Sequence, residues 1–245
     1  MEYYFTKKEN VNADKSELIV DDFEYKHLVK VLRKNKGDEI TITDGERNIY
    51  SCVIKEVEKS RIICLIKRTN FNLYELSVDI KLYLSPLRNS SRFEFAVEKA
   101  VELGVNSIHP VITEHTVNKN IFSSSKTERL RKIIIGAMGQ SQRCLLPKLY
   151  EPVSFEKMIE NTSVNENKVV MYEHSDDRSE IKLLDKSKGL VLMIGPEGGF
   201  SESEISLLLK NNWLVRSLGK RKLRAETAVI VSIFETISKF NYNEP

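Results

Sequence analysis

Cysteine is scarce and long apolar runs are missing in this sequence of 245 residues. The cysteines Cys52, Cys64 and Cys144 lie far apart, without the spacing of metal ligands, so we expect free thiols in a reducing cytoplasm and no metal site. No stretch of about 18 apolar residues occurs, which argues against a membrane-spanning helix. The charged N-terminus is followed by no apolar core, so we expect a cytoplasmic protein without a secretory signal peptide.

The sequence also has little excess of one charge, because its formal net charge is only +3. The basic residues are nevertheless clustered. Five basic residues and no acidic residue lie between Lys26 and Lys36, and four of the five residues from Lys220 to Arg224 are basic. Such clusters can neutralise phosphates. A solvated face is the alternative for either cluster alone, but two of them make nucleic-acid binding a competitive interpretation.

The first third of the chain has the pattern of short β-strands. Apolar and polar residues alternate in residues 40–42 and 50–54, and Asp44-Gly45 is a hairpin signal. Residues 24–34 have helical spacing instead. The two faces of that helix are Lys26, Lys30 and Arg33 on one side, and Leu28, Val31 and Leu32 on the other. Short strands joined by tight turns indicate a small barrel, with a domain boundary within residues 68–77.

From residue 78 onward, strands alternate with helices. The spacing predicts strands at residues 78–84, 105–111, 168–172, 190–194 and 213–218, and helices over 93–101, 130–138 and 230–237. The run Leu190–Ile194 is entirely apolar, which is typical of a central strand in a parallel sheet. This alternation predicts an α/β fold in which helices cover both faces of a parallel sheet.

A glycine loop, Gly195–Gly199 (Gly-Pro-Glu-Gly-Gly), directly follows the apolar strand. Ser201 and Glu204 have the spacing of a capping box, so a helix is expected to begin after the loop. Ligands bind at the carboxyl ends of strands in open α/β sheets, and glycines let the backbone approach them closely. A tight turn is the alternative, but three glycines around a Pro-Glu pair favour a ligand loop. The loop is neither a dinucleotide fingerprint nor a P-loop.

A second glycine loop, Leu218–Arg224, leads from a predicted strand into a helix that begins near Glu226. Because both loops follow strands of one predicted sheet, we expect them to form one pocket. The alternatives are structural. Glu226 complements the dipole of its own helix, and Arg221 and Arg224 belong to a solvated loop.

These two loops resemble the 16S ribosomal RNA (uracil-N3) methyltransferase family of the SPOUT class. The resemblance rests on Ile194–Ser201 (Ile-Gly-Pro-Glu-Gly-Gly-Phe-Ser) together with Leu218–Ala228 (Leu-Gly-x-Arg-x-Leu-Arg-x-Glu-Thr-Ala). Three further segments are similar to family motifs, so that the match extends over nearly the whole chain. They are His27–Arg33, Lys99–Val105 and Gln140–Arg143.

The resemblance implies an α/β protein with a SPOUT-type knotted parallel sheet domain, residues 73–245, preceded by a small PUA-like RNA-binding β-barrel domain, residues 1–72. It implies a homodimer that binds S-adenosyl-L-methionine (SAM) in a C-terminal trefoil knot, with the site completed across the dimer interface. The implied product is N3-methyluridine in 16S ribosomal RNA, formed on a partly or fully assembled small ribosomal subunit.

The resemblance also implies which residues take part. Those expected to bind SAM are Tyr172, Ile194, Gly195, Pro196, Glu197, Gly198, Gly199, Leu218, Gly219, Leu223, Thr227 and Ala228. Those expected to contact RNA are Lys26, Lys30, Arg33, Arg88, Arg92, Gln140 and Arg143. For Gln140 and Arg143, a role at the C-terminal end of a helix is the alternative.

Methylation at uracil N3 requires loss of a proton that is not acidic at neutral pH. We expect Arg221 or Arg224 to stabilise the negative charge that develops on the base. Glu226 is a candidate for accepting the proton, and stabilisation of its helix start is an equally supported alternative.

Several positions depart from the family pattern. The usual Lys-Gly is Asn89-Ser90, an arginine is replaced by His115, a glutamate by Gly139, a glycine by Gln142 and a threonine by Ala225. These departures bear on RNA contacts more than on SAM binding, because the two glycine loops are almost intact.

Three other functions stay open on the sequence alone. A SPOUT enzyme that methylates ribose 2′-hydroxyls would carry a similar glycine loop. A non-catalytic RNA-binding assembly factor would need the basic clusters but no SAM. A nucleotide-binding protein is disfavoured, because a phosphate-loop lysine and paired metal-binding acids are absent.

Overall fold

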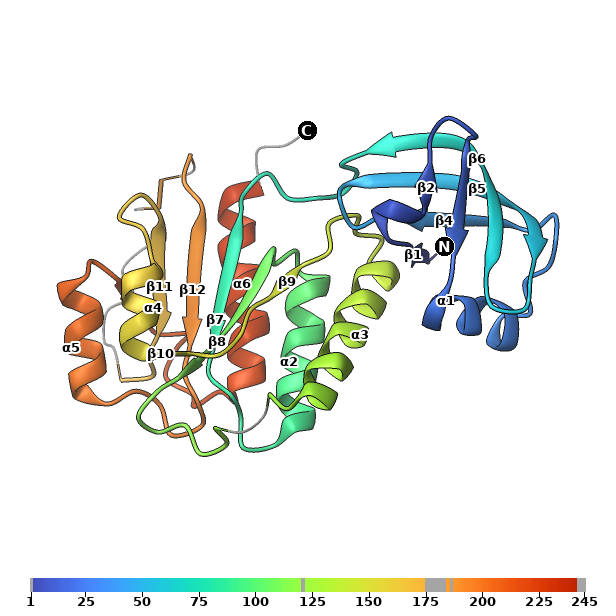
Figure 1. The fold of residues 1–245 in the computed structure, drawn as a ribbon. Helices are drawn as coiled ribbons and strands as arrows, with labels where there is room; N and C mark the ends of the chain where they lie inside the picture. The colour runs from blue at the N-terminus through green and yellow to red at the C-terminus, as the bar shows by residue number, and fades with distance from the viewer. Residues whose placement is uncertain (1, 120–121, 175–183, 186, 242–245) are drawn as a thin grey trace. The chain divides into compact units, whose positions relative to one another are not determined.

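The computed structural model describes residues 2–119, 122–174, 184–185 and 187–241 of the chain (Figure 1). The chain forms two compact units. The first contains the residues up to Glu75 together with Ile135–Leu146, and the second contains Leu76–Ile134 and the chain from Pro147 onward. The first of these boundaries lies close to residue 72. Nothing in the sequence pattern indicated that the segment 135–146 belongs with the first unit.

The first unit contains a curled sheet and short helical segments. Its described elements are β1 (Tyr3–Phe5), the 3-10 helix η1 (Lys8–Asn10), β2 (Val11–Asn12), β3 (Glu17–Val20), α1 (Asp22–Lys26), the π-helix η2 (His27–Val31), β4 (Glu39–Thr43), β5 (Asn48–Val57) and β6 (Ile62–Phe71). Within the described residues the strands form a six-stranded sheet in the order β1-β4-β5-β6-β3-β2. Only the β1–β4 pair in this order is parallel.

One face of this sheet is buried, as the alternating pattern predicts. Tyr4, Ile42 and Tyr50 lie in one row across β1, β4 and β5, and all three belong to the core. Side chains on a strand alternate between the two faces, so every second residue joins this core. The sheet curls until Thr6, just after β1, donates a hydrogen bond to the carbonyl oxygen of Ile19 in β3. This curled sheet is the predicted small barrel.

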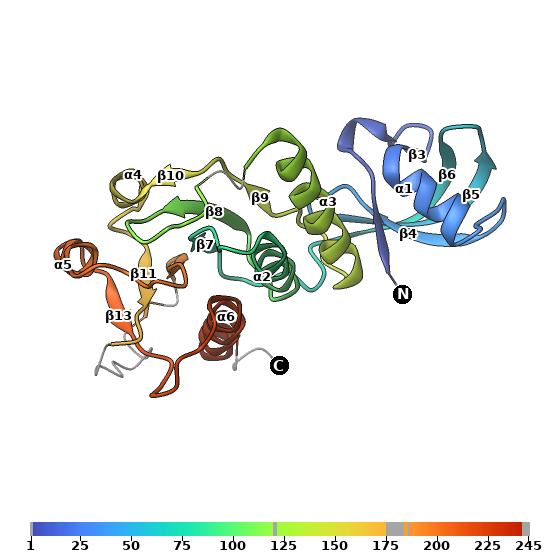
Figure 2. The same cartoon turned by 90° about the horizontal axis from the view of Figure 1, so that it is seen from below.

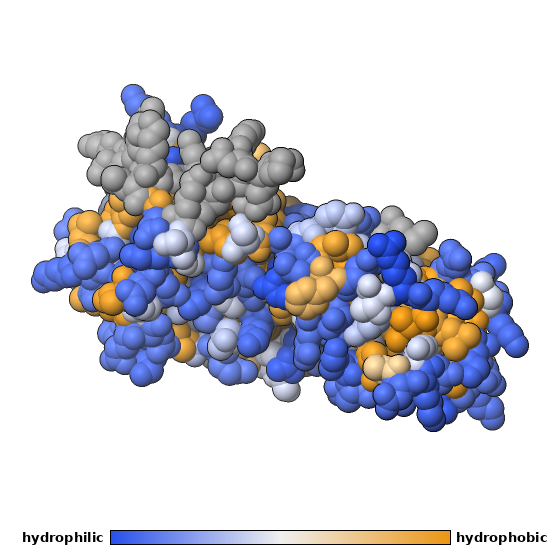
Figure 3. All heavy atoms as spheres, turned by 90° about the horizontal axis from the view of Figure 1, so that it is seen from above, coloured by the Kyte–Doolittle hydropathy of each residue, from blue (hydrophilic) through white to orange (hydrophobic). Residues whose placement is uncertain are grey.

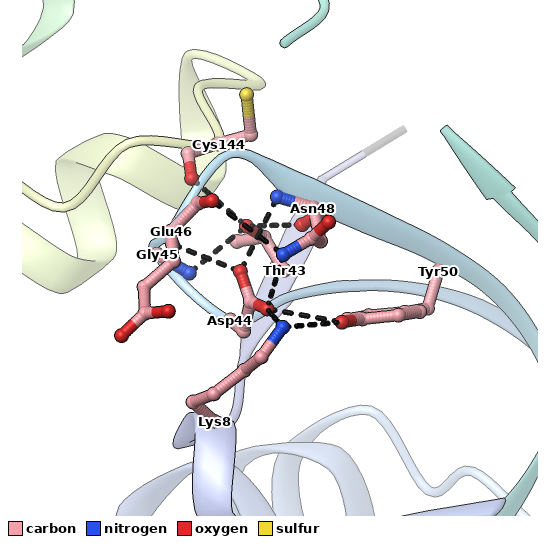
Figure 4. Close-up of polar contacts among 8 residues, drawn as sticks. All are labelled: Lys8, Thr43, Asp44, Gly45, Glu46, Asn48, Tyr50 and Cys144. Atoms are coloured by element: carbon pink, nitrogen blue, oxygen red, sulfur yellow. Dashed lines mark hydrogen bonds and ion pairs between the residues drawn. The ribbon is translucent and has the colours of Figure 1, made fainter. Parts of the chain in front are cut away.

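Asp44 anchors the hairpin between β4 and β5 (Figure 4). Its buried carboxylate accepts hydrogen bonds from Lys8 Nζ (2.9 Å), Asn48 Nδ2 (2.8 Å) and the Tyr50 hydroxyl (3.0 Å). Burial acts to raise the pKa of Asp44, but these hydrogen bonds outweigh burial and the pKa is lowered. The Asp-Gly hairpin signal therefore marks a turn whose aspartate is ionised and fully paired.

The segment that follows α3 (Ser124–Gln140) is held from two sides within the first unit. The carbonyl oxygen of Cys144 accepts a hydrogen bond from Thr43 Oγ1 at 3.2 Å (Figure 4). The Glu75 carboxylate accepts a hydrogen bond from Arg143 Nη2 at 2.8 Å, and both side chains are almost fully buried. The backbone N–H groups of the two residues after Arg143 also donate to Glu75. The prediction that Arg143 contacts RNA is therefore corrected, because its guanidinium is buried and ion-paired.

The basic helical segment differs from its predicted form. Leu28 is fully buried, but Val31 and Leu32 are exposed. The cause is the π-helical turn η2, in which the N–H of Leu32 donates to the carbonyl of His27, five residues earlier. The extra residue in this turn moves the following side chains off the buried face. The prediction that Val31 and Leu32 share an apolar face with Leu28 is therefore wrong.

The second unit is built on a parallel sheet. Its described elements are β7 (Ile80–Leu84), α2 (Ser90–Glu102), β8 (Ser107–Ile112), the first part of α3, β9 (Lys148–Leu149), β10 (Val153–Ser154), α4 (Phe155–Asn161), β11 (Asn167–Met171), β12 (Leu190–Ile194), α5 (Glu202–Lys210), β13 (Leu214–Arg216) and α6 (Ala225–Asn241). The described strands have the order β10-β8-β7-β12-β11-β13, and β9 also pairs with β8. All these pairings are parallel.

Helices cover both faces of this sheet, as the strand–helix alternation predicts. Figure 2 shows α2 and α6 on one side of the sheet and α4 and α5 on the other. On the α4–α5 side, Phe155, Met158 and Leu208 pack in one cluster with Val191 and Met193 of β12. On the opposite side α6 packs against β12 and α2. Burial from both sides explains why β12 is an unbroken apolar run.

One face of the molecule shows how polar and apolar side chains are distributed. The face in Figure 3 is mostly hydrophilic, and its apolar atoms appear in separate patches. The helices of the described residues include none that is long and apolar enough to cross a bilayer. In the same residues, no three His, Cys, Asp or Glu side chains lie together in a group that could hold a metal ion.

Candidate functional site

A cavity of about 460 Å³ lies at the C-terminal edge of the parallel sheet in the second unit. The ends of three neighbouring parallel strands supply most of its wall. The lining comes from Met171–Glu173 at the end of β11, from Ile194–Glu197, Gly199 and Phe200 at the end of β12, and from Ser217–Gly219 and Arg221–Ala225 after β13, with Arg92 of α2 and Ala228 of α6. Parallel strands open their carboxyl ends at one edge of a sheet, which is where ligands bind in such folds. The prediction that the two glycine loops share one cavity is confirmed.

The first glycine loop is shaped by its neighbours on both sides. A Cβ atom on Gly195 would lie 2.9 Å from Cε2 of Phe200, so a side chain here would force this ring to move. After the loop, Ser201 and Glu204 form the predicted capping box. The N–H of Ser201 donates to the Glu204 carboxylate at 3.0 Å, and the N–H of Glu204 donates to Ser201 Oγ at 3.3 Å. This box sets where α5 begins and therefore where the loop ends.

The second glycine loop begins earlier than the sequence predicts. The preceding strand, β13, ends at Arg216, so Ser217 and Leu218 already belong to the loop. Gly219 has a φ of +116°, a backbone conformation that residues with a side chain rarely adopt. The N–H of Gly219 donates to Ser217 Oγ at 3.3 Å, which stabilises the turn.

Arg92 links the first glycine loop to the start of α6 through one carboxylate in each. Its Nε and Nη2 atoms donate to the two oxygens of Glu226 at 2.9 and 2.6 Å, and its Nη1 donates to Glu197 at 3.1 Å. Glu197 also accepts the backbone N–H of Arg88 at 3.2 Å. A bidentate arginine pair fixes both the position and the plane of a carboxylate. Arg92 therefore ties α2, the first glycine loop and the start of α6 together.

The electrostatics of Glu226 follow from this contact. The side-chain hydrogen bonds from Arg92 hold the pKa of Glu226 below its usual value, although partial burial acts in the opposite direction. The nearby charge of Arg224 also lowers this pKa. The carboxylate is therefore ionised at neutral pH but is a poor proton acceptor. This geometry supports a structural role at the start of α6.

The turn after β8 braces the first glycine loop from another side. Nδ1 of His115 lies 3.1 Å from the carbonyl oxygen of Gly198 and 3.2 Å from that of Gly199. A carbonyl oxygen only accepts, so this ring nitrogen carries the proton. The same turn contacts the capping box, because the N–H of Glu114 donates to Glu204 at 2.9 Å. The loop is thus held at both its glycines and its exit.

Two family models match the chain. One describes an RNA methyltransferase domain and matches residues 74–235, and the other describes an RNA methyltransferase PUA domain and matches residues 20–67. The chain is also 31% identical over 221 residues to the Ribosomal RNA small subunit methyltransferase E of Bacillus subtilis (strain 168), covering 86% of this chain and 85% of that protein. This chain belongs to the ribosomal RNA small subunit methyltransferase E family.

Other members of the family are similarly close. The protein of the same name from Aquifex aeolicus (strain VF5) is 32% identical, covering 91% of this chain and 94% of that one. A crystal structure of the Neisseria gonorrhoeae member, bound to S-adenosyl methionine, superposes with a TM-score of 0.88 at 26% identity and covers 98% of each chain. The predicted fold class, a SPOUT-type α/β domain preceded by a PUA-like β-barrel, is confirmed.

Most residues that the family resemblance assigned to SAM lie around the cavity. Its lining includes Tyr172, Ile194, Gly195, Pro196, Glu197, Gly199, Leu218, Gly219, Leu223 and Ala228. Gly198 and Thr227 are outside the lining, and Gly198 packs against His115 instead. Arg221 and Arg224 line the cavity.

The predicted RNA contacts divide into three groups. Lys26, Lys30, Arg33 and Gln140 are exposed on the first unit, and Arg88 is exposed on the second. Arg143 is buried against Glu75. Arg92 lies at the wall of the cavity, where its guanidinium pairs with two carboxylates and stays partly exposed, so its contact with RNA stays a prediction.

Sequence reasoning missed part of the cavity wall. The missed residues are Met171, Glu173, Phe200, Ser217, Lys222 and Ala225, together with the position of Arg92. Met171 is the last residue of β11 and Glu173 lies just after it, and this strand carries no recognisable motif. The signal that could have found them is their place at the carboxyl end of the strand beside the first glycine loop, but strand order is not visible in a sequence.

The departures from the family pattern have local structural explanations. Asn89 caps α2, because its side chain accepts the N–H of Ser91 at 2.8 Å. A side chain at Gly139 would collide with the carbonyl oxygen of Tyr3, which leaves no room for a glutamate. Gln142 has a φ of +59°, the left-handed conformation for which the family's glycine is suited. His115, which replaces the family's arginine, is itself a hydrogen-bond donor to the carbonyl oxygens of the first glycine loop.

Proposed function

We propose that this protein transfers the methyl group of SAM to N3 of a uridine in small-subunit ribosomal RNA. The observation that carries the proposal is the single cavity made by the two glycine loops and braced by Arg92. Family membership supports the reaction class, since relatives over most of the chain carry the name of a small-subunit ribosomal RNA methyltransferase and a solved one is bound to SAM.

The residues around the cavity fit SAM. Its volume of about 460 Å³ lies in the usual range for small-molecule sites. Ile194, Leu218 and Leu223 would provide apolar walls for the adenine, and the backbones of the two glycine loops would bind polar atoms of the nucleoside and the amino-acid part.

The protein contributes mainly alignment and electrostatics. SAM, when bound, supplies a methyl group already activated by the positive sulfur, so the protein must align the acceptor and exclude water. Arg221 and Arg224 line the cavity and would stabilise the negative charge on a uracil that has lost its N3 proton. Glu226 is held by Arg92 with a lowered pKa, so we assign it to positioning of the loops. Solvent is then the proton acceptor.

The target base must have its pairing edge free, because N3 takes part in base pairing. The enzyme therefore needs an unpaired or extruded uridine. Lys26, Lys30, Arg33, Arg88 and Gln140 would position the RNA through its backbone. The PUA-like barrel, up to about residue 72, would serve this purpose and the remaining chain would perform the reaction. A partly or fully assembled small subunit in the cytoplasm is the proposed setting.

We also propose that the protein acts as a homodimer that pairs through α6. Val231 and Phe234 of this helix are 38% and 64% exposed. They line a hollow together with Leu218 and Gly219, which also line the proposed SAM cavity. A second copy seated on this face would therefore lie beside the site and could complete it.

The proposal is tested by SAM binding and by mapping the product. Calorimetry should show uptake of SAM by the purified protein. RNA from a strain that lacks the protein should gain N3-methyluridine at one position when it is incubated with protein and SAM, as mapped by mass spectrometry of nucleosides. A methyl group on a ribose would identify a 2′-O-methyltransferase instead, and no SAM uptake would leave a non-catalytic assembly factor.

Arg224→Ala separates chemistry from cofactor binding. Loss of a cation that stabilises developing charge should reduce the single-turnover rate by roughly 10²-fold or more, while SAM affinity changes little. A normal single-turnover rate in this variant would remove Arg224 from the mechanism.

A further inference from the structure

The segment Lys26–Lys36 of the first unit carries positive charge that is not neutralised. Its five cations are Lys26, Lys30, Arg33, Lys34 and Lys36. Among the residues that the structure describes, none of the five forms an ion pair. All but Lys34 are exposed. Clustered cations without acidic partners attract a polyanion.

Two large apolar side chains lie exposed in the middle of this charge. Val31 is 66% exposed and Leu32 is 40% exposed. They are placed there by the π-helical turn η2, which separates them from the buried face that Leu28 occupies. Single apolar residues are common on protein surfaces. Here, however, an adjacent pair lies directly between Lys30 and Arg33.

The segment also keeps an arginine in an unfavourable backbone conformation. Arg33 has a φ of +54°, and the N–H of Lys34 donates to the carbonyl of Leu28 at 2.9 Å to close the helix end. Glycine is the usual residue at such an end. The left-handed conformation costs other residues about 1–2 kcal/mol. Local strain of this kind is characteristic of functional positions, and here it presents a guanidinium to solvent beside Val31 and Leu32.

We propose that Lys26–Lys36 is a mixed contact surface for the RNA substrate, on which the cations bind phosphates while Val31 and Leu32 pack against an unstacked base or its ribose. This inference rests on the proposed function and adds a means of distinguishing unpaired from paired RNA. Phosphate contacts position an RNA without reading it. Recognition of RNA beyond its charge uses the unstacked bases of loops and bulges, and an apolar pair is suited to the face of such a base.

The charge pattern favours RNA over a protein partner on this surface. Protein interfaces are depleted of lysine at their centres, where charges would be desolvated. Here the apolar pair directly follows Lys30 and directly precedes Arg33 and Lys34, within a segment that contains no acidic residue between Lys26 and Lys36. A phosphate backbone neutralises these cations, and its bases supply the apolar contact.

Binding measurements over a range of salt concentrations test the inference. The probes are 16S ribosomal RNA transcribed in vitro and a fully paired RNA duplex, titrated with the full-length protein. Val31→Ser/Leu32→Ser should weaken binding of the 16S RNA by roughly tenfold, because it removes apolar burial. Binding of the duplex, and the slope of log K against log salt, should stay unchanged. Lys26→Gln/Lys30→Gln should instead weaken both RNAs and reduce that slope by about 1–2.

Matched controls come from the second unit. Val164 and Leu209 are 82% and 55% exposed, so Val164→Ser/Leu209→Ser removes a comparable apolar surface and should not alter RNA binding. Lys157→Gln removes an exposed cation that is already paired with Glu160 and should leave the salt slope unchanged. Thermal unfolding checks that each variant is folded. Val31→Thr, which keeps the side-chain shape, replaces the double variant if that one is unstable.

Several outcomes would overturn the inference. One is wild-type affinity of the Val31→Ser/Leu32→Ser variant for 16S RNA, and another is an equal loss for the duplex. A change in sedimentation behaviour would make this surface a contact between copies of the chain. These outcomes leave the proposed function intact as long as the variant binds SAM and transfers methyl groups. Absence of SAM uptake by the wild-type protein would remove the proposed function itself.

Discussion

Glu24 of α1 is a carboxyl group buried inside the first unit. Burial raises its pKa to about 7, and the hydrogen bond from the N–H of Phe5, at 3.4 Å, only partly opposes this. Nothing in the sequence distinguishes Glu24 from the exposed glutamates nearby. Its environment is created by β1, which is distant from α1 in the chain but adjacent in the fold.

Glu24→Gln should make the pH dependence of stability weaker. The ordinary pKa of 4.5 is raised to about 7 in the folded state, so between these values the folded protein binds more protons than the unfolded chain. Stability therefore falls as pH rises through this window. The variant should match the wild type near pH 5 and exceed it at pH 8 by on the order of 2 kcal/mol in thermal unfolding. Glu39→Gln, an exposed control, should show no such difference, and an equal pH dependence in Glu24→Gln would contradict the assignment.

At the scale of elements, hairpins and loops are joined by single charged side chains. Asp44 holds the β4–β5 hairpin through Lys8, Asn48 and Tyr50, and Arg92 holds three elements around the proposed SAM cavity. In both cases a local motif places the side chain, and residues far away in the sequence complete its contacts.

Asp44→Asn should destabilise the first unit. It removes the charge that Lys8 and the Tyr50 hydroxyl bind, in a side chain without solvent exposure, and should lower the free energy of unfolding by about 2–4 kcal/mol at pH 7. The folded pKa is depressed below 3.8, so this stabilisation is present above that pH and is lost as pH falls through the lower value. Urea unfolding at pH 7 and pH 3 measures it. Asp14→Asn, at an exposed site, is the control, and a difference that persists unchanged at pH 3 would exclude the ionised form as its source.

Arg92→Lys should weaken SAM binding. Lysine cannot make the bidentate contact with Glu226 and reach Glu197 as well, so the two glycine loops lose their brace and calorimetry should show roughly tenfold lower affinity. Arg129 makes the same bidentate contact with Glu94 on α2, at 2.7 and 2.9 Å, and lies outside the cavity lining. Arg129→Lys is therefore the matched control. Equal SAM affinities in the two variants would show that Arg92 does not position the loops.

At the scale of the whole molecule, the exposed apolar residues of α6 form the proposed interface of the homodimer. Phe234→Asp should dissociate the proposed homodimer, because a charge in an apolar interface is costly to desolvate. Sedimentation should then report a monomer, and methyl transfer should fall with it. Val164→Asp changes a more exposed apolar residue elsewhere and should leave the assembly unchanged. A wild-type protein that sediments as a monomer would contradict the dimer proposal directly.

Much of the architecture could be predicted from local patterns. The curled sheet, the parallel strands, the capping box at Ser201 and Glu204, and the two glycine loops all follow from periodicity, turn residues and motifs within short windows. Such features depend on neighbours along the chain, so the amino-acid order alone specifies them. The π-helical turn at His27–Val31 is the exception, since its spacing looks α-helical.

Contacts between side chains that are far apart in the sequence were decided by the tertiary structure. Arg92 and Glu226 are 134 residues apart, and Arg143 and Glu75 are 68 residues apart. Both arginines pair with acids that only strand order and helix packing bring near, and for Arg143 the resulting burial excludes the predicted contact with RNA. Local spacing specifies which face a residue occupies, whereas the partner on the other side of that face is set by long-range packing. For this reason the family and the two glycine loops could be predicted from the sequence, but the contacts of Arg92 with Glu197 and Glu226 beside the cavity could not.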